Sequence, residues 1–473
     1  MENKFDLIII GAGCAGAGAA YKARSLGLSV CIVENRDVGG TCLNRGCIPT
    51  KTLLHSAALL DDSRNGSEFG VETGEAGGKK LDFAKLSAWK NTVISTLRQG
   101  QTSGLEKAGV VIERGTARVE AAGKVSIAGE GGTKMLEARA ILVATGTVPA
   151  KVPVPGGKLP GVYTSDDFLE GEGLFPKRLV VFGAGVIAVE FAFAYSGFGS
   201  EVSIIARRTI FASLEREIGQ TVTMQFKKRG IAVYPQSGIA KIEQDGNSLN
   251  VHLPDGKIIN TDAVLMATGR EADASSLFAA SCTPEITDKG FIKVDDSMQS
   301  TIPGIFAAGE IAGGVQLAHA AEADGDYAGE CIAHALSGGA GGAGGGGYAS
   351  KKRIIPACVY TTPEIACAGM TGDEAKARGI PAVTGKGVFG ANGKAFLEKQ
   401  ERAFIKLVFH QENKKLIGAQ FLCNHATEMI PWAVQCIEAG ISAHQIEETI
   451  FAHPTYNETI KAAAKDAITR GGL

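Results

Sequence analysis

The chain has 473 residues, 45% of them hydrophobic, and a formal net charge of −2 at pH 7. This length predicts about three domains with sizeable cores, and the charge balance, which lacks a long basic run, argues against a nucleic-acid partner. Ten cysteines in so long a chain do not form a small disulfide scaffold, and they fit a reducing cytoplasmic location.

A short apolar strand, Leu7 to Ile10, opens the chain and runs into the turn GAGCAG at residues 11–16. A strand, a GxGxxG turn and a helix predict a dinucleotide site, because the backbone approaches a pyrophosphate and the helix N-terminus opposes its charge. The next strand, residues 29–33, leads into Glu34, where a carboxylate would bind ribose hydroxyls. The predicted turn contacts are Gly11, Gly13 and Gly16. No segment of the chain is long and apolar enough to cross a membrane.

Residues 39–51 read GGTCLNRGCIPTK and place two thiols, Cys42 and Cys47, at the predicted start of a helix. Pro49 fits the first helical turn, where a proline costs no hydrogen bond. The positive end of the helix dipole lowers the pKa of a thiol there, so the two cysteines can cycle between disulfide and dithiol. The alternatives are buried structural cysteines or metal ligands. No second cysteine pair has zinc-site spacing, so we predict no metal site.

Together with the GAGCAG turn, this segment resembles the flavin disulfide reductase family and, within it, the dihydrolipoamide dehydrogenases. The resemblance runs from Phe5 to roughly Ile468. It implies an α/β fold with two Rossmann-like dinucleotide-binding domains, one for FAD and one for NAD(P), and a C-terminal α+β interface domain. In such a fold the isoalloxazine lies against Cys47, and Cys42 faces the substrate. We expect an FAD-binding domain from residues 1–150 and 273–347, an NAD(P)-binding domain at 151–272, and a dimerisation domain at 348–473.

Between the cysteines and the second unit we predict a surface loop at 61–80, a helix at 82–107 and strands across 110–140. An apolar strand at 140–146, AILVATG, then ends the first part of the FAD domain, and the next domain follows. The resemblance also assigns FAD contacts to Thr41, Thr145 and Gly146.

A second strand and glycine turn follow at residues 179–182 and 183–188, the latter reading GAGVIA. Alanine replaces the third glycine, which the contact between helix and sheet tolerates. Two such units in one chain imply two bound dinucleotides. The predicted nucleotide contacts here are Gly183, Gly185, Ile187 and, at the end of a later ATG segment, Gly269.

The position that corresponds to Glu34 in this second unit is Ala206, followed by Arg207 and Arg208. A carboxylate would accept bonds from a ribose 2′-hydroxyl, whereas an arginine attracts a 2′-phosphate. We therefore favour NADP over NAD, with a solvated basic loop as the alternative interpretation.

The resemblance assigns further roles near the flavin. Glu190 matches the carboxylate that pairs with the lysine of CIPTK, here Lys51, and the pair would steady the charge that hydride transfer moves. The segment TIPGIFAAGE resembles the family's ribityl-binding segment, with Glu310 where aspartate is usual. Ala318 begins a predicted helix that could face the flavin's pyrimidine end.

Residues 337–347, SGGAGGAGGGG, predict a flexible surface insertion before the interface domain. We expect strands there at 388–389, 403–410 and 417–421, and helices at 426–438 and 445–451. The segment His453-Pro454-Thr455-Tyr456-Asn457-Glu458 matches the family's HPT-x-x-E, in which a carboxylate orients a histidine that moves protons to and from a thiol. In relatives this dyad reaches the disulfide of the other subunit, so a homodimer is expected and a monomer should be inactive.

The function implied is a dihydrolipoamide dehydrogenase that serves a lipoyl carrier protein or domain and transfers electrons through Cys42, Cys47 and FAD to NAD(P). The alternatives are an NADPH-dependent reductase of another substrate, of the glutathione or mercuric type, and a non-catalytic FAD-holding subunit of a multienzyme complex. The chain ends Arg470-Gly471-Gly472-Leu473, without the vicinal cysteines usual in mercuric reductases.

Overall fold

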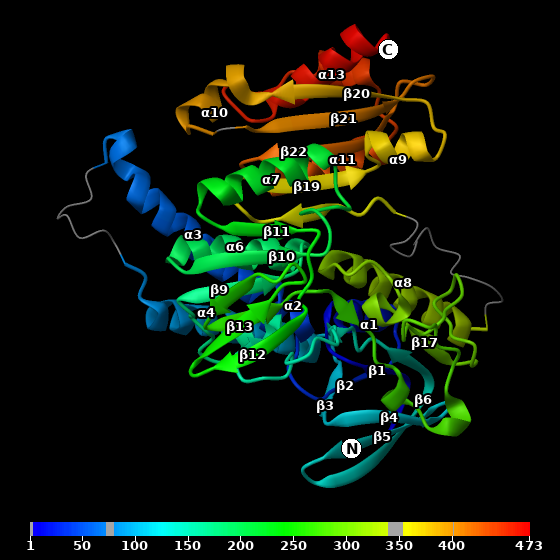
Figure 1. Ribbon diagram of the computed structural model, residues 1–473. Coiled ribbons are helices and arrows are strands. Elements are labelled where there is room, and N and C mark those ends of the chain that lie inside the picture. The colour runs from blue at the N-terminus through cyan, green and yellow to red at the C-terminus, as the bar shows by residue number, and fades with distance from the viewer. Residues whose placement is uncertain (1–2, 72–79, 339–352, 401) are drawn as a thin grey trace.

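A computed structural model describes residues 3–71, 80–338, 353–400 and 402–473 (Figure 1). It confirms the predicted α/β fold with two Rossmann-like units and a C-terminal α+β domain. Most of the predicted glycine-rich loop, residues 339–347, lies outside the described residues. The predicted domain boundaries near residues 150, 272 and 347 stay predictions.

The first unit is a seven-stranded sheet in the order β3-β2-β1-β6-β5-β4, with β17 paired to β6. Strands β1, β2, β3, β17 and the C-terminal half of β6 run parallel, and β4, β5 and the other half of β6 form an antiparallel extension. The strands are β1 (Lys4–Ile10), β2 (Val30–Glu34), β3 (Val111–Arg114), β4 (Thr116–Ala121), β5 (Lys124–Gly129), β6 (Gly132–Val143) and β17 (Ile305–Ala307). Helices α1 (Cys14–Ser25) and α8 (Ala318–Leu336) pack against each other and against this sheet.

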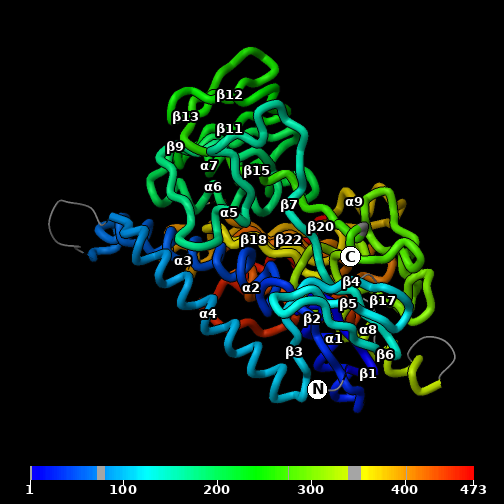
Figure 2. The backbone as a smooth tube through the Cα atoms, turned by 90° about the horizontal axis from the view of Figure 1, so that it is seen from below, coloured from blue at the N-terminus to red at the C-terminus, as the bar shows by residue number. Residues whose placement is uncertain are grey.

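The second unit is a parallel sheet in the order β11-β10-β9-β15-β8, which carries a three-stranded antiparallel sheet. Figure 2 shows it as a green lobe that projects from the rest of the chain. Its strands are β8 (Val162–Tyr163), β9 (Arg178–Phe182), β10 (Glu201–Ala206), β11 (Ala232–Pro235), β12 (Lys241–Asp245), β13 (Ser248–His252), β14 (Ile258–Thr261) and β15 (Ala263–Met266). The chain enters and leaves the lobe through the antiparallel pair β7 (Val148–Pro149) and β16 (Arg270–Glu271).

The C-terminal domain is an antiparallel sheet in the order β18-β19-β22-β21-β20. Its strands are β18 (Ala357–Val359), β19 (Glu364–Gly369), β20 (Ala382–Val388), β21 (Phe404–His410) and β22 (Leu416–Cys423), and its helices are α9 (Gly372–Ala377), α10 (Gly393–Leu397), α11 (Ala426–Glu438), α12 (Ala443–Glu448) and α13 (Glu458–Gly471). Helix α11 confirms the predicted bounds. The helix predicted at 445–451 instead spans Ala443–Glu448, and a capping box at Ser442 satisfies its first amides.

The remaining helices, α2 to α7, lie in the part of the chain before the C-terminal domain. They are α2 (Gly40–Arg45), α3 (Cys47–Asn65), α4 (Phe83–Lys107), α5 (Ser165–Leu169), α6 (Val186–Phe198) and α7 (Arg216–Lys228). Helix α6 is apolar along most of its length and packs against α3, where Ala57 lies so close that a Cβ on Gly197 would sit 3.1 Å from its Cβ. This packing places α3, which begins at Cys47, against α6, which follows the glycine turn of the second unit.

The predicted loop at 61–80 is wrong over its first part. Helix α3 continues to Asn65 and is followed by a 3-10 turn, Gly66–Phe69, while residues 72–79 lie outside the described residues. Two arginine contacts extend the helix beyond its apolar positions: Arg64 donates to the carbonyl of Gly197 at 2.7 Å, and Arg229 pairs with Asp61 at 2.6 Å. Tertiary contacts to α6 and α7 thus override a polar local sequence.

Candidate active site

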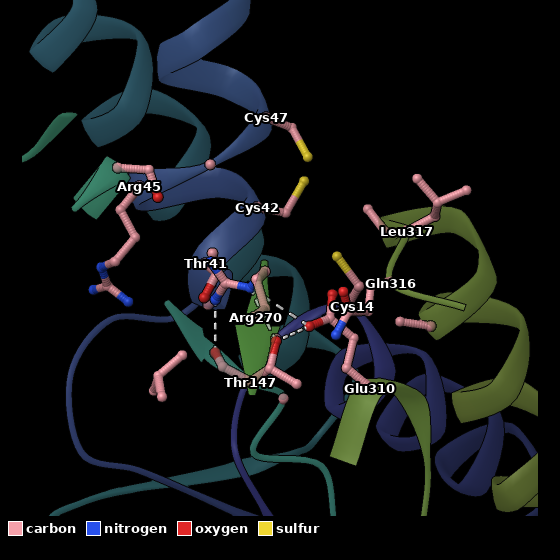
Figure 3. Close-up of a pocket in the computed structure, with 18 of the residues that line it drawn as sticks. Cys14, Thr41, Cys42, Arg45, Cys47, Thr147, Arg270, Glu310, Gln316 and Leu317 are labelled. Atoms are coloured by element: carbon pink, nitrogen blue, oxygen red, sulfur yellow. Dashed lines mark hydrogen bonds and ion pairs between the residues drawn. The ribbon is translucent and has the colours of Figure 1, made fainter. Parts of the chain in front are cut away.

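A cavity of about 1440 Å³ lies where the two nucleotide-binding units meet (Figure 3). This volume exceeds the roughly 300–1,000 Å³ of an ordinary small-molecule pocket and suits extended ligands. Of the residues predicted from sequence, the cavity brings together Gly11, Gly13, Glu34, Thr41, Cys42, Cys47, Lys51, Thr145, Gly146, Gly183, Gly185, Ile187, Glu190, Arg207, Arg208, Gly269, Glu310 and Ala318. Gly16, His453 and Glu458 do not line it.

The first glycine turn has the close backbone approach that a pyrophosphate site needs. Gly11 has φ +104°, and a Cβ there would lie 2.6 Å from the carbonyl oxygen of Ala144. A Cβ on Gly16 would lie 1.9 Å from the carbonyl oxygen of Gly11, so Gly16 permits the helix packing instead of touching a ligand. Gly13 faces open space apart from Gly40, and no side chain caps α1. A side chain at Gly13 would fill this cradle, so the turn fits the pyrophosphate of FAD.

Glu34 ends β2 with its side chain held by the backbone. Its Oε2 accepts from the amide of Ala12 at 2.8 Å, and its Oε1 accepts from the amide of Arg36 at 2.7 Å. The residue is only 7% exposed and lies beside the glycine turn. Because a carboxylate has about four acceptor sites, these two bonds leave capacity for a ribose hydroxyl.

The second glycine turn repeats this geometry. Gly183 has φ +156°, and a Cβ there would lie 2.2 Å from the carbonyl oxygen of Ala267, whereas a Cβ on Gly185 would meet nothing within 4 Å. Helix α6 also begins without a side-chain cap. Arg207 and Arg208 follow β10 as exposed residues on the cavity wall. The second glycine turn therefore fits a pyridine nucleotide. The guanidinium groups of Arg207 and Arg208 lie just after the end of β10.

The two cysteines face each other across the junction of α2 and α3, and both are free thiols (Figure 3). A hydrogen bond from the Cys42 thiol, with the nearby charge of Lys51, lowers the pKa of Cys47 to about 7 against opposing burial. The pKa of Cys42 is raised by its hydrogen bonds to Cys14 and Cys47 and by burial. Cys47 is therefore the better leaving group and Cys42 the sulfur that stays protonated.

A charge pair links the two units beside the thiols. The Nζ of Lys51 lies 2.9 Å from Oε2 of Glu190, whose side chain is only 3% exposed. Sequence reasoning missed Tyr360, which donates its amide to Oε1 of Glu190 at 3.0 Å and places its ring centroid 4.6 Å from the same Nζ. The C-terminal domain thus fixes the pair from a third side, although no local motif around Tyr360 signals it.

Glu310 lies in the cavity, bonded by the hydroxyl of Thr147 and 3.8 Å from Nε of Arg270. Arg270 also donates to Thr147, through Nε to its hydroxyl and through Nη2 to its carbonyl, at 2.9 and 2.6 Å. Both partners come from the segments that join the two units. The longer side chain at 310 is accommodated by this network, which sequence reasoning did not predict.

The predicted dyad forms, but away from the cavity. Nδ1 of His453 lies 2.9 Å from Oε1 of Glu458, and the other carboxylate oxygen accepts from the amide of Thr455 at 2.9 Å. The Thr455 amide and His453 lower the pKa of Glu458. The imidazole is 76% exposed on the C-terminal domain. The imidazole therefore lies outside the cavity that Cys42 and Cys47 line.

Within residues 3–71, 80–338, 353–400 and 402–473, no group of three or more His, Cys, Asp or Glu side chains is arranged to hold a metal ion. No helix in those ranges combines the length and apolar character needed to cross a bilayer.

Comparison with known proteins places the chain in a family. The model of the family "Pyridine nucleotide-disulphide oxidoreductase" matches residues 5–325, and that of its dimerisation domain matches residues 355–464. The dihydrolipoyl dehydrogenase of Chlamydia pneumoniae is 33% identical, over 97% of this chain and 96% of its own. One from Bacillus subtilis (strain 168) is 33% identical, over 98% of both chains.

Solved structures agree on the fold. The HOCl-induced flavoprotein disulfide reductase RclA from Escherichia coli superposes with a TM-score of 0.84 at 26% identity, over 97% of this chain and 99% of its own. LpdA from Mycobacterium tuberculosis has a TM-score of 0.85 at 24% identity, over 97% of this chain and 99% of its own, which supports the fold alone.

Proposed function

Because the chain belongs to the pyridine nucleotide-disulphide oxidoreductases, which are FAD- and NAD(P)-dependent enzymes acting on sulfur groups, we propose that it oxidises dihydrolipoamide. The observation that carries this proposal is the pair Cys42 and Cys47 on the cavity wall beside Lys51 and Glu190. The dihydrolipoyl dehydrogenases of Chlamydia pneumoniae and Bacillus subtilis support the choice of substrate. That substrate would be presented on a lipoyl carrier protein or domain.

The chemistry begins with the Cys42–Cys47 disulfide. One thiolate of dihydrolipoamide attacks Sγ of Cys42, the sulfur–sulfur bond to Cys47 breaks, and Cys47 leaves as a thiolate. The hydrogen bond from Cys42 and the charge of Lys51 favour this thiolate in the reduced pair. The second substrate thiol then attacks the mixed disulfide, so that lipoamide forms and Cys42 is released.

Both substrate thiols must lose a proton during these steps. We assign proton removal to His453 of the partner subunit, oriented by Glu458 through the 2.9 Å bond. Within one chain, this histidine does not line the cavity of Cys42. A homodimer in which each dyad serves the other subunit's thiols explains that separation.

The cofactor sites follow from the two glycine turns. The turn at Gly11 and Gly13, with Glu34, would hold FAD, and the turn at Gly183 and Gly185 would hold NAD(P). When bound, FAD supplies two-electron transfer between the reduced thiols and the nicotinamide. Arg207 and Arg208, in place of a carboxylate, favour NADP over NAD.

The proposal is tested by a turnover matrix of the purified FAD-containing protein. Dihydrolipoamide, oxidised glutathione and Hg(II) are each assayed with NAD(H) and NADP(H). We expect dihydrolipoamide with NADP to give the highest kcat/KM. Faster turnover of glutathione or Hg(II) would refute the substrate assignment, and a preference for NAD would refute the nucleotide assignment alone.

Cooperation between subunits is tested by co-expressing Cys42→Ser and His453→Gln chains under two different tags. Each variant alone should be inactive. A mixed dimer holds one site with both intact cysteines and an intact histidine, so random assembly should restore about a quarter of wild-type activity. Inactive mixed dimers would contradict a dyad that acts across the interface.

A further inference from the structure

Beyond the redox pair, two further thiols line the cavity, Cys14 and Cys358, and neither the glycine turn nor the redox pair assigns a role to Cys14. Cys14 is the first residue of α1 and lines the cavity, with its sulfur directed toward Cys42 (Figure 3). It is a free thiol with intermediate exposure. A cysteine here is therefore reachable from the space that the redox pair shares.

The backbone brings Cys14 and Cys42 together. The amide of Gly39 donates to the carbonyl of Ala12 at 2.8 Å. A Cβ on Gly40 would lie only 2.8 Å from Cα of Gly13. Because the residue before Cys14 contacts the loop that begins α2, the side chains of Cys14 and Cys42 project into the same space from two adjoining backbones.

The three sulfurs lie in one part of the cavity, and Cys42 affects the pKa of both of the others. In the reduced site Cys42 has a single S–H, for which Cys14 and Cys47 are alternative acceptors. Its hydrogen bond lowers the pKa of Cys14, although burial opposes the shift. By contrast, burial raises the pKa of Cys31, a structural cysteine on β2, to about 12. In the reduced site the pKa of Cys14 is therefore shifted in the direction of a reactive cysteine, opposite to the shift of Cys31. Once Cys42 and Cys47 form a disulfide, this hydrogen bond is lost, and what remains is the position of Cys14 beside Cys42 in the cavity.

We propose that Cys14 is a third redox-active thiol of this site, and that Cys42 exchanges between a disulfide with Cys47 and a disulfide with Cys14. In the exchange, the Cys14 thiolate attacks Sγ of Cys42, the Cys42–Cys47 bond breaks, and Cys47 leaves as a thiolate. One disulfide and one thiolate stand on each side, so no external oxidant or reductant is needed.

The exchange changes which sulfur of the oxidised protein is a free thiolate. When Cys42 is bonded to Cys14, both sulfurs of the resulting disulfide lie on the side of the first glycine turn, and Cys47 is a free thiolate. Cys14 therefore provides an alternative oxidised state of the site, reached without turnover and reversed when Cys47 attacks Cys42.

Tryptic peptides can separate the three thiols. Cleavage after Lys4, Lys22, Arg36, Arg45 and Lys51 leaves Cys14 alone in 5–22, Cys42 alone in 37–45 and Cys47 alone in 46–51. The FAD-containing protein is oxidised with oxidised dithiothreitol, blocked with N-ethylmaleimide in acid, digested and analysed by mass spectrometry. We expect 37–45 linked mainly to 46–51 and, in a minor fraction, to 5–22.

The Cys47→Ser variant removes the partner that competes with Cys14 for Cys42. Oxidised dithiothreitol should then take two electrons from Cys14 and Cys42, and the link between 5–22 and 37–45 should rise about tenfold or more over wild type. The link should be absent from Cys14→Ser/Cys47→Ser and retained in the matched control Cys436→Ser/Cys47→Ser. Flavin content verifies folding, and Cys47→Ala provides a second background.

Alkylation of both Cys14 and Cys42 in folded, oxidised Cys47→Ser and Cys47→Ala proteins would overturn the proposal. A wild-type protein that lacks the link between 37–45 and 46–51 would instead refute the proposed function. The two failures are therefore distinguishable in one digest.

Discussion

The two nucleotide-binding units use the same turn for different tasks. Gly11 and Gly183 both place backbone where a Cβ would clash with a carbonyl, at 2.6 and 2.2 Å. The units differ in what surrounds the turn. The first contacts the cysteine loop and ends its second strand at a backbone-bound Glu34, whereas the second ends at exposed arginines and contributes Glu190 to a charge pair. Both turns therefore leave room for a pyrophosphate, and under the proposed function the neighbouring side chains select the nucleotide and the chemistry.

The largest effects should come from breaking one turn at a time. Gly183→Val forces a branched side chain against the carbonyl of Ala267, so kcat/KM for NADPH should fall about 10³-fold while FAD stays bound. Gly11→Val should instead yield protein without flavin. Flavin absorbance per chain and NADPH-dependent turnover measure the two outcomes.

The control is Gly100→Ala, because a Cβ at this position in α4 would meet nothing within 4 Å. This variant should keep both flavin and turnover. Loss of FAD from Gly183→Val, or retention of FAD by Gly11→Val, would show that the units are not divided as proposed.

The next effect concerns the charge pair at the junction of the units. Glu190→Gln keeps an acceptor for the amide of Tyr360 but removes the charge opposite Lys51. We expect the rate at which NADPH bleaches the bound flavin to fall about 10²-fold, because a preorganised charge no longer balances the transfer. Stopped-flow absorbance measures this rate.

Glu201→Gln, an exposed change at the start of β10, serves as the control for Glu190→Gln and should leave the rate unchanged. An unaltered rate in Glu190→Gln itself would place the pair outside the transfer step.

A smaller effect separates the two nucleotides. Arg207→Glu introduces a carboxylate next to Ala206 at the end of β10, so the ratio of kcat/KM for NADPH over NADH should fall about 10-fold or more. Steady-state kinetics with both nucleotides measures the ratio, and Arg378→Glu on the C-terminal domain is the matched charge reversal. An unchanged ratio would support the interpretation of residues 207–208 as a solvated loop.

The smallest effect is a shift in a pH profile. The thiolate of Cys47 is the reactive form, so its alkylation by iodoacetamide in the reduced protein should rise with pH and reach half its maximum near pH 7. Lys51→Met removes a charge that stabilises the thiolate, so the midpoint should move to higher pH. Mass spectrometry of the tryptic peptide that contains Cys47, 46–51 in the wild type and 46–64 in Lys51→Met, follows the reaction. A midpoint that stays near 7 in Lys51→Met would contradict the role of Lys51.

Local patterns predicted a large part of this site. The helix start at Cys47, both glycine turns and the pairs of Lys51 with Glu190 and His453 with Glu458 follow from motifs or from a family resemblance that short segments carry. The helix start, the two turns and the pair of His453 with Glu458 are set by backbone conformation within a few residues, which sequence spacing records directly. The pair of Lys51 with Glu190 spans 139 residues and was predicted only because each residue lies in a segment that resembles the family.

Contacts across long sequence separations could not be predicted in the same way. The bond from Tyr360 to Glu190 spans 170 residues, and that from Arg270 to Thr147 spans 123. The continuation of α3 beyond Asp61 likewise depends on Arg229 of another unit. No spacing rule records such contacts, because the packing of whole domains creates them.

The most direct test of the account is an anaerobic titration of the oxidised, FAD-containing protein with dihydrolipoamide, quenched with N-ethylmaleimide and digested. We predict that the disulfide linking peptides 37–45 and 46–51 disappears in step with the dithiol added and that lipoamide appears in equal amount. If that disulfide persisted while the flavin was reduced, electrons would bypass Cys42 and Cys47, and the central claim would be wrong.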